Sequence, residues 1–368
     1  MPVSRWTFSA SAAYFELVQR RIDGLWSLTY AVVAVLIAAM MAMGGIETLR
    51  SGTTSMVLEL PLGWPIAVCA LLAAWLAWVV LLGLSLGVGS QVSAMLNADK
   101  PIMQWPDLLD QPRPAPDRTI AYGQDPLQLV DLWLPAGKGP HPVVVMIHGG
   151  CWQTEIATRD IMNYIADDLR KDGIAVWNIE YRGVDRGGGY PGTYLDVGSA
   201  ADLLGAQAKA LNLDLTHTIA IGHSAGGHLA LWLAARQALP QGEPLRGANP
   251  LRIDTAISQA GIADLRAAMQ RTGHACGTDA PTKMAGDRFA LTSPPEMPAS
   301  KAQQIQFHTD KDRIAPPVYA ETYAADMKKR GIGVENHVHG PEGHVELIAP
   351  SSRSWAAQKA RIKQLLGR

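Results

Sequence analysis

The run of residues with the clearest chemical meaning is Gly222-His223-Ser224-Ala225-Gly226-Gly227. It follows the apolar run HTIAI, which predicts a strand, and it opens AGGHLALWLAARQ, which predicts a helix. A G-x-S-x-G sequence in that setting forms a tight turn that exposes the serine hydroxyl, and small neighbours are needed because a larger side chain would collide with the backbone. We therefore predict that Ser224 is a nucleophile. The alternative is a tight turn that carries a solvated serine.

A second glycine-rich peptide, HGGCW at 148–152, follows the predicted strand PVVVMI. Glycines at such a place let backbone amides approach a substrate oxygen without steric interference. We expect the amides of Gly149, Gly150 and Ala225 to form an oxyanion hole, in which each donor lowers the barrier by about 3 kcal/mol.

The other residues of this peptide are expected to support the site. His148 should fix the loop, and Cys151 should line the substrate pocket because no base lies next to it that would make it a reactive thiol. Trp152 and His223 are placed in the same pocket. His228, like His223, is tied to the start of the predicted helix and is expected to pack or to support the site.

The HGG-x-W and GHSAGGHLA motifs resemble those of the α/β-hydrolase superfamily, in the branch with hormone-sensitive-lipase-like carboxylesterases and kynurenine formamidases. The resemblance extends from about residue 118 to the C-terminus. It implies a mostly parallel sheet covered by helices on both faces, and hydrolysis of a small carboxylic ester or aryl formamide through an acyl-enzyme, without metal or cofactor. HGGCW looks like the formamidase version of the oxyanion loop.

The resemblance also covers EYRGVDRGGGYPGTYLDV, which is similar to bacterial members of this branch. Four of its residues are interpreted as structural, namely Glu180, Tyr181, Arg182 and Asp196. By the same resemblance, segments near 183–192 and 271–298 would form a lid region, and the second would be a mobile pocket wall.

The serine needs a base, and ten histidines are available. His344 lies in the loop GPEGH, between the predicted strand VENHVH and the last predicted helix, where an α/β-hydrolase carries its base. His337 and His339 are two residues apart on that strand, so their side chains should lie on the same face. We expect them to be ordinary side chains rather than metal ligands.

The acid that orients the base should follow the preceding strand, where FHTDKDRIAPP offers two carboxylates. Asp312 stands four residues before Pro316, which is the usual register of HGxxD-x-x-x-P segments. It is the predicted third member of a Ser224-Asp312-His344 triad. Asp310 is the alternative and would otherwise be a turn carboxylate. The chain order Ser, Asp, His is the order this fold uses.

Strand-like and helix-like runs alternate from residue 118 onward, which predicts a parallel sheet with helices on both faces. At such a sheet the reactive groups gather at the carboxyl ends of the strands. The predicted strands include 142–147, 174–179, 218–221 and 253–258, and the predicted helices include 161–171, 194–211, 225–237, 317–330 and 354–366.

The first 96 residues have a different character. No charged residue occurs between Asp23 and Glu47 or between Glu59 and Asp99, which predicts two transmembrane helices at about 24–46 and 64–88. A cleaved signal peptide would have a shorter apolar core and would leave the second run unexplained.

The segment TLRSGTTSMVLELPLGWPIAV within this region also looks like part of the last two helices of the small membrane subunit of tripartite ATP-independent transporters, a resemblance that covers about fifty residues. That resemblance raises the possibility of a membrane-protein partner. Arginine is concentrated before the first predicted helix, which places the catalytic domain in the cytoplasm. Proline-rich residues 97–117 are interpreted as a semi-rigid linker to a catalytic domain at 118–368.

Charge and cysteine content exclude several classes of protein. With 32 Lys and Arg against 33 Asp and Glu, the chain has no basic surplus for nucleic acid. Its three cysteines, Cys69, Cys151 and Cys276, lie far apart, from which we expect no disulfide and a reducing compartment.

The function expected from the sequence is that of a membrane-anchored serine hydrolase, of carboxylesterase or arylformamidase type, acting on small esters or amides at the lipid bilayer. The alternatives are a transporter-associated subunit whose hydrolase-like domain binds ligands, and a serine peptidase. No second domain of the kind that such peptidases carry is visible in the sequence.

Overall fold

The computed structural model of this chain describes residues 75, 78, 101–270 and 275–368. The chain divides into two units, Met1–Ser93 and Ala94–Arg368, and the second contains every predicted catalytic residue. Trp75 and Trp78 are helical, and the rest of the predicted membrane helices 24–46 and 64–88 lies outside the described residues. Within the described residues, no helix has the length and apolar character needed to cross a bilayer.

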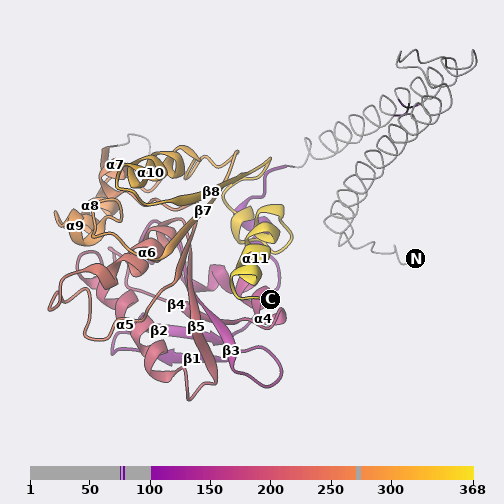
Figure 1. The fold of residues 1–368 in the computed structure, drawn as a ribbon, viewed down its shortest axis with the longest axis horizontal. Coiled ribbons are helices and arrows are strands. Elements are labelled where there is room, and N and C mark those ends of the chain that lie inside the picture. Colours follow the sequence, from indigo (N-terminus) through magenta and orange to yellow (C-terminus); the bar gives the residue numbers. More distant parts are fainter. Residues whose placement is uncertain (1–74, 76–77, 79–100, 271–274) are drawn as a thin grey trace, which may run out of the picture. The chain divides into compact units, whose positions relative to one another are not determined.

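The second unit is built on an eight-stranded sheet with the order β1-β2-β4-β3-β5-β6-β7-β8 (Figure 1). The pairs β1–β2 and β2–β4 are antiparallel, and every pair from β4 to β8 is parallel. The strands are β1 (Arg118–Ala121), β2 (Leu129–Trp133), β3 (His141–Ile147), β4 (Ala175–Ile179), β5 (Leu213–His223), β6 (Thr255–Gln259), β7 (Gln303–Thr309) and β8 (Val334–His339).

Helices follow most of the strands, as the alternating sequence pattern predicts. The parallel pairs from β4 to β8 confirm the mostly parallel sheet. The α-helices are α3 (Trp105–Leu109), α4 (Asn163–Lys171), α5 (Gly192–Gln207), α6 (Ala225–Ala235), α7 (Leu265–Gln270), α8 (Asp279–Ala285), α9 (Phe289–Thr292), α10 (Val318–Lys329) and α11 (Arg353–Leu365). Short 3₁₀ turns lie at Arg159–Met162, Arg236–Ala238 and Glu346–Ile348.

Side chains alternate between the two faces of the sheet along each strand, and helices cover both faces. The side chain of Gln259 in β6 bonds Gln358 of α11, whereas its neighbour Ser258 lies against Gly227 of α6. Helices α4 and α11 lie on the first face, joined by an ion pair between Lys359 and Asp168, and α5 and α6 lie on the other (Figure 1). The central strands are buried on both faces and are mostly apolar, as is typical of parallel strands.

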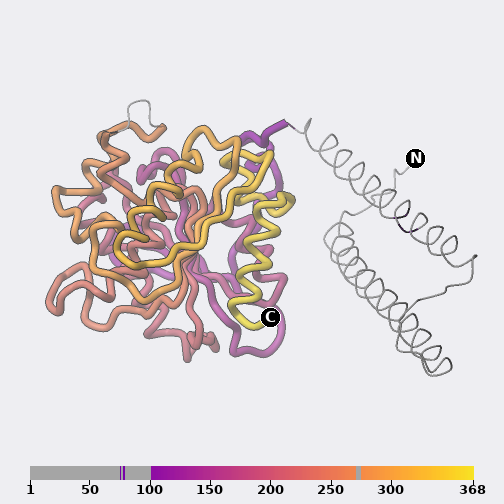
Figure 2. Tube along the Cα trace, turned by 45° about the horizontal axis from the view of Figure 1, so that its top comes forward, coloured from indigo at the N-terminus to yellow at the C-terminus, as the bar shows by residue number. Residues whose placement is uncertain are grey.

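The described part of the expected linker is packed against the domain. Helix α3 (Trp105–Leu109) is short, and its first turn is capped by Asp107, which accepts a hydrogen bond from the amide of the N-cap residue Gln104 at 2.7 Å. Leu108 is fully buried, and the Met103 amide donates to Glu346 Oε1 at 2.7 Å. This indigo segment runs beside the yellow C-terminal part of the chain (Figure 2).

The two segments expected to form a lid region contact each other. The Tyr190 amide donates to the Lys283 carbonyl at 2.9 Å, which joins 183–192 to helix α8. Helices α8 and α9 then cover α5 and α6, because Tyr194 donates to the Met284 carbonyl and Trp232 Nε1 donates to the Leu291 carbonyl. The described residues 275–298 are therefore anchored to the domain by specific contacts.

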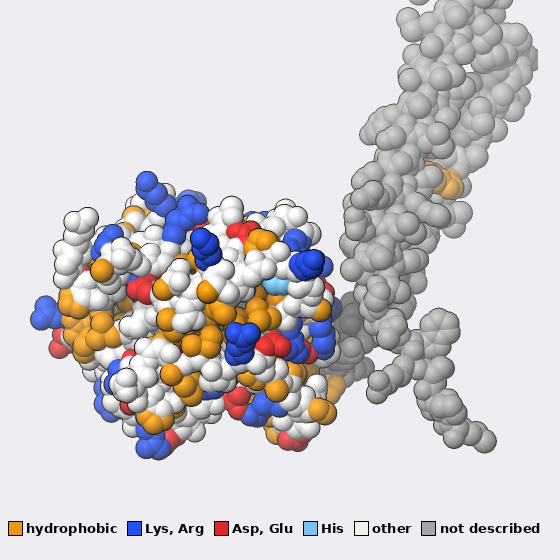
Figure 3. Space-filling model, turned by 90° about the horizontal axis from the view of Figure 1, so that it is seen from below, with side chains coloured by type: hydrophobic (Ala, Val, Ile, Leu, Met, Phe, Trp, Pro, Cys, Tyr) orange, Lys and Arg blue, Asp and Glu red, His pale blue; other side chains and the backbone are white. Residues whose placement is uncertain are grey.

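The face drawn in Figure 3 carries basic and acidic side chains scattered among apolar ones. Neither sign of charge dominates this face. This mixture agrees with the near-zero net charge of the chain.

Candidate active site

Ser224 occupies a strained turn between β5 and α6. Its backbone has φ 53° and ψ −117°, a conformation that costs a non-glycine residue on the order of 1–3 kcal/mol. Two glycines make the turn possible: a Cβ at Gly222 would lie 2.0 Å from the Gly226 carbonyl oxygen, and one at Gly226 would lie 2.2 Å from the Ile147 carbonyl oxygen. The small residues predicted around the nucleophile are thus required by close backbone contacts.

The glycine-rich loop after β3 passes directly against this turn. A Cβ on Gly149 would lie 2.9 Å from the His223 carbonyl oxygen and 3.1 Å from the Ser224 Cβ. Three residues in succession then adopt left-handed backbone angles, with φ of 100° at Gly150, 54° at Cys151 and 56° at Trp152. Gly149 therefore lies against the elbow, where the start of α6 brings its unpaired first amides, and Gly150 follows it and packs against Ala157.

His148 anchors this loop through a buried charge network. Its Nε2 lies 2.7 Å from Glu180 Oε1, and its ring stacks on Tyr181 at 4.3 Å between ring centroids. Tyr181 in turn donates its hydroxyl to the His148 carbonyl at 3.1 Å, and the second Glu180 oxygen accepts from the Arg159 amide at 2.9 Å. His148 fixes the loop as expected, and Glu180 and Tyr181 have the structural role that the sequence suggested.

The electrostatics of this network favour an ionised Glu180. Burial by itself raises the pKa of Glu180, but the interaction with His148 and the hydrogen bonds from the Arg159 and Tyr181 amides outweigh it and lower the pKa. The Glu180 carboxylate is fully buried beneath the loop, and each of its oxygens has a hydrogen-bond partner.

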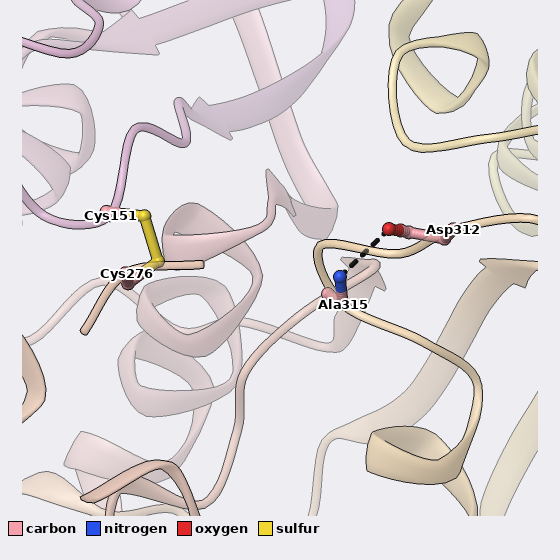
Figure 4. The surroundings of a disulfide bond; sticks show 4 residues. All are labelled: Cys151, Cys276, Asp312 and Ala315. Atoms are coloured by element: carbon pink, nitrogen blue, oxygen red, sulfur yellow. Dashed lines mark hydrogen bonds between the residues drawn. A yellow bond between two sulfur atoms is a disulfide. The ribbon is translucent and has the colours of Figure 1, made fainter. Parts of the chain in front are cut away.

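His344 and Asp312 form a short hydrogen bond. His344 Nδ1 lies 2.6 Å from Asp312 Oδ2, and the Asp312 side chain is fully buried. Asp312 Oδ1 accepts from the amides of Ile314 and Ala315, both at 2.8 Å, and Figure 4 draws the second of these bonds. Burial raises the pKa of Asp312, and the bond to His344 and these amides more than compensate and lower it.

Asp310, the alternative acid, lies elsewhere. Its carboxylate accepts from the Glu342 amide at 3.3 Å and lies 3.4 Å from Lys311 Nζ, and its side chain is 40% exposed. It is a turn carboxylate at the end of β7.

The predicted nucleophile and the predicted base are linked through His223, which directly precedes Ser224. His223 Nε2 lies 3.1 Å from the His344 carbonyl oxygen, and the two rings are 4.4 Å apart. The described residues include no hydrogen bond between Ser224 Oγ and His344. Catalytic hydrogen bonds of this kind commonly shorten only when substrate is bound.

Two of the three predicted pocket residues have a different environment from the one expected. Trp152 is fully buried, with its ring edge-on to His228 at 5.6 Å, so it belongs to the core beneath the loop. Cys151 forms a disulfide with Cys276, and Figure 4 shows this bond joining the oxyanion loop to the segment before α8. The third, His223, lies between His344 and Gly149.

The disulfide overturns the expectation that the cysteines are unpaired. The two residues are 125 positions apart, but their Cα atoms are 5.1 Å apart because both segments lie at the carboxyl edge of the sheet. The prediction rested on the separation of the cysteines along the sequence, and that separation does not show which cysteines meet in the folded chain. The reducing compartment inferred from it loses its support as well.

His337 and His339 share one face of β8, as predicted. Both rings stack on Phe307 of β7, at 4.6 and 5.8 Å, and His337 Nε2 bonds Glu335 at 2.7 Å.

Two buried histidines should make the stability of the domain depend on pH. Burial lowers the pKa of both His228 and His308 to about 4, from an ordinary value near 6.5. Between these values the unfolded chain binds more protons than the folded one, so acid favours unfolding. We expect the free energy of unfolding to fall by about 1.4 kcal/mol per histidine for each pH unit lost between about 6.5 and 4.

Urea unfolding of the full chain at pH 7, 6 and 5 measures this dependence. His308→Gln should reduce the slope of the free energy of unfolding against pH by the contribution of one histidine. This holds whatever the variant does to stability at pH 7. An unchanged slope in the variant would contradict the assignment of a neutral, buried His308.

The sequence comparison identifies the family of this domain. The BD-FAE family model matches residues 130–321, more than half of the chain. The chain belongs to the BD-FAE family. The BD-FAE match contains Ser224, Asp312 and the oxyanion loop, whereas His344 and residues 101–117 lie outside it.

Relatives of known name are similar over shorter stretches. Esterase LipC of Mycobacterium tuberculosis is 33% identical over 118 residues, which are 31% of this chain and 28% of that protein. The probable isoprenylcysteine alpha-carbonyl methylesterase ICMEL1 of Arabidopsis thaliana is 28% identical over 125 residues, 34% of this chain and 26% of that protein. The matched part of the chain thus spans little more than a quarter of either relative.

Solved structures support the fold. Esterase B from Lactobacillus rhamnosis superimposes with a TM-score of 0.59 at 18% identity, over 70% of this chain and 88% of that one. Together with the sheet order, this establishes an α/β-hydrolase fold of the kind found in esterases.

Sequence reasoning missed two residues beside the site. Trp105 of α3 lies edge-on to both His223 and His344, with ring centroids 6.3 and 6.4 Å apart. Glu346 holds the base loop, because its Oε2 accepts from the Gly343 amide at 3.0 Å while its Oε1 accepts from Met103. The only local signal for Trp105 was a helix start, WPD, with proline and an acidic residue in the first turn.

Proposed function

We propose that this protein is a serine hydrolase that cleaves small carboxylic esters through a Ser224-His344-Asp312 triad. The observation that carries the proposal is the 2.6 Å bond between buried Asp312 and His344, whose loop also contacts the residue before Ser224. Family membership and the names of the relatives support an esterase.

In the proposed reaction, Ser224 Oγ attacks the ester carbonyl carbon while His344 Nε2 accepts its proton. Asp312 holds the tautomer that carries a proton on Nδ1, which leaves Nε2 free to act as base. The negative oxygen that develops receives hydrogen bonds from the amides of Gly149, Gly150 and Ala225.

The carbon–oxygen bond then breaks, and His344 returns the proton to the departing alcohol. Water, activated by the same imidazole, attacks the acyl-enzyme and releases the acid. Apart from the substrate and this water, the groups named in these steps are side chains and amides of the chain itself.

Two narrower statements belong to this proposal. Aryl formamides are a second substrate class, supported by the likeness of the HGGCW peptide to the formamidase version of the oxyanion loop. Anchoring in a membrane by helices at about 24–46 and 64–88 is supported by two apolar stretches, each long enough to span a bilayer. Small-molecule substrates and the lipid bilayer are the partners that follow.

The proposal is tested with the full chain in detergent. We expect hydrolysis of p-nitrophenyl acetate, and covalent labelling by a fluorophosphonate at the peptide that contains Ser224, identified by mass spectrometry. Ser224→Ala should abolish labelling. Ser300→Ala is the matched control because this serine precedes the amino end of β7, where its hydroxyl bonds the Ala234 carbonyl.

A folded chain that neither hydrolyses the ester nor reacts with the fluorophosphonate would refute the proposal. N-formylkynurenine, assayed beside short-chain esters, separates a formamidase from an esterase. Sedimentation of the full chain with membranes tests the anchor.

A further inference from the structure

The segment that precedes the sheet forms part of the surroundings of the base. It is attached to the domain at several points: Met103 bonds Glu346, Asn163 Nδ2 donates to the Pro114 carbonyl at 3.0 Å, and Leu108 is buried. These contacts hold helix α3 in place at the carboxyl edge of the sheet. A side chain on α3 can therefore be a fixed component of the site.

Trp105 is that side chain. Its indole ring stands at 73° to the ring of His344 and at 77° to the ring of His223, with centroids 6.4 and 6.3 Å away. Trp105 is half-buried and His344 is 6% exposed, so part of the Trp105 side chain is accessible to solvent beside the buried imidazole.

The chemistry of the triad says which part of a substrate meets this ring. His344 Nδ1 is occupied by Asp312, so the proton returns to the leaving oxygen from Nε2. The alcohol part of an ester must then lie beside the imidazole, whereas the acyl part is bonded to Ser224. An aromatic ring in edge-to-face contact with the imidazole is therefore a candidate to contact the alcohol.

We propose that Trp105 determines specificity for the alcohol part of the substrate and favours flat, apolar alcohols, aryl esters above all. The inference rests on the proposed function and extends it. An indole offers a large apolar surface, and aromatic groups bind it by stacked or edge-to-face contact. Trp105 lies outside the residues that match the family, so the preference belongs to this chain's own N-terminal segment.

The test compares esters that share one acid. Phenyl acetate and ethyl acetate form the same acetyl-enzyme, so kcat/KM reports on the step in which the alcohol leaves. We expect Trp105→Ala to lower the ratio of kcat/KM for phenyl acetate to that for ethyl acetate by about tenfold, the factor that one aromatic pair supplies. Trp105→Phe should restore most of the ratio.

Leu109→Ala is the matched control, because Leu109 is a partly buried apolar residue on the same helix, packed against the hydrophobic core. It should keep the wild-type ratio. Loss of activity toward both esters in equal proportion, or an unchanged ratio in Trp105→Ala, would overturn the inference.

Fluorophosphonate labelling separates this result from a failure of the proposed function. If wild-type chain labels at Ser224 and the ratio does not respond to Trp105→Ala, only the role of Trp105 is wrong. If wild-type chain does not label, the triad itself is refuted.

Discussion

Asp312→Asn should lower kcat/KM for p-nitrophenyl acetate by about 10⁴-fold, the loss seen when the acid of such a triad becomes an amide. Asp312 Oδ1 accepts two backbone amides, so the amide oxygen of asparagine will take that position. Its NH₂ group then faces His344 Nδ1 and donates to it. The imidazole is forced to carry its proton on Nε2, where it cannot accept one from Ser224.

Asp310→Asn provides the control two residues away. Its carboxylate is part-exposed and does not contact His344, so kcat/KM should stay within about twofold of wild type, as is usual for surface substitutions. Thermal unfolding of both variants shows whether each is folded. A large loss in Asp310→Asn together with a small one in Asp312→Asn would reverse the assignment of the acid.

Removing the Cys151–Cys276 disulfide should lower the free energy of unfolding by about 3–5 kcal/mol, because the bond closes a long loop in the unfolded chain. That is a large share of the 5–15 kcal/mol by which a typical domain is stable. The disulfide also fixes Cys151 in the left-handed run that follows Gly149, so its loss should loosen the oxyanion loop and reduce kcat/KM on the order of tenfold.

The measurement compares urea unfolding of Cys69→Ala with that of the triple variant that also carries Cys151→Ala and Cys276→Ala. Cys69→Ala alone is the control, because Cys69 has no part in this disulfide and its removal prevents thiol exchange. Equal unfolding midpoints and equal kcat/KM in the two chains would contradict the role given to the disulfide.

The same bond changes the expected location of the domain. Disulfides persist in oxidising compartments, so we expect the catalytic domain on the non-cytoplasmic side, in contrast to the side that the arginines before the first apolar run favour. Mass spectrometry of non-reduced peptides from membranes alkylated at harvest decides between them. Free, alkylated Cys151 and Cys276 would indicate the cytoplasm.

Much of the site could be predicted because its chemistry is encoded locally. Ser224 sits in a turn whose glycines are required by contacts among near neighbours in sequence and the adjacent strand, and the strand and helix patterns on each side of it are strong. The choice of Asp312 over Asp310 followed from its distance to Pro316. The structure gives Asp312, and not Asp310, the bond to His344.

What the sequence determined by itself is the alternation of the central strands and helices, the residue types at the elbow and the oxyanion loop, and the two long apolar stretches of the first hundred residues. Strands β1 and β2 and helices α7, α8 and α9 were not predicted from it. These depend on periodicity and on short motifs, which are properties of neighbouring residues. Tertiary structure alone decided that Cys151 meets Cys276, that Glu180 lies under His148, and that Trp105 stands beside His344. Each of these pairs joins segments distant in sequence, and folding of the sheet brings them together at its carboxyl edge, where no local pattern records the meeting.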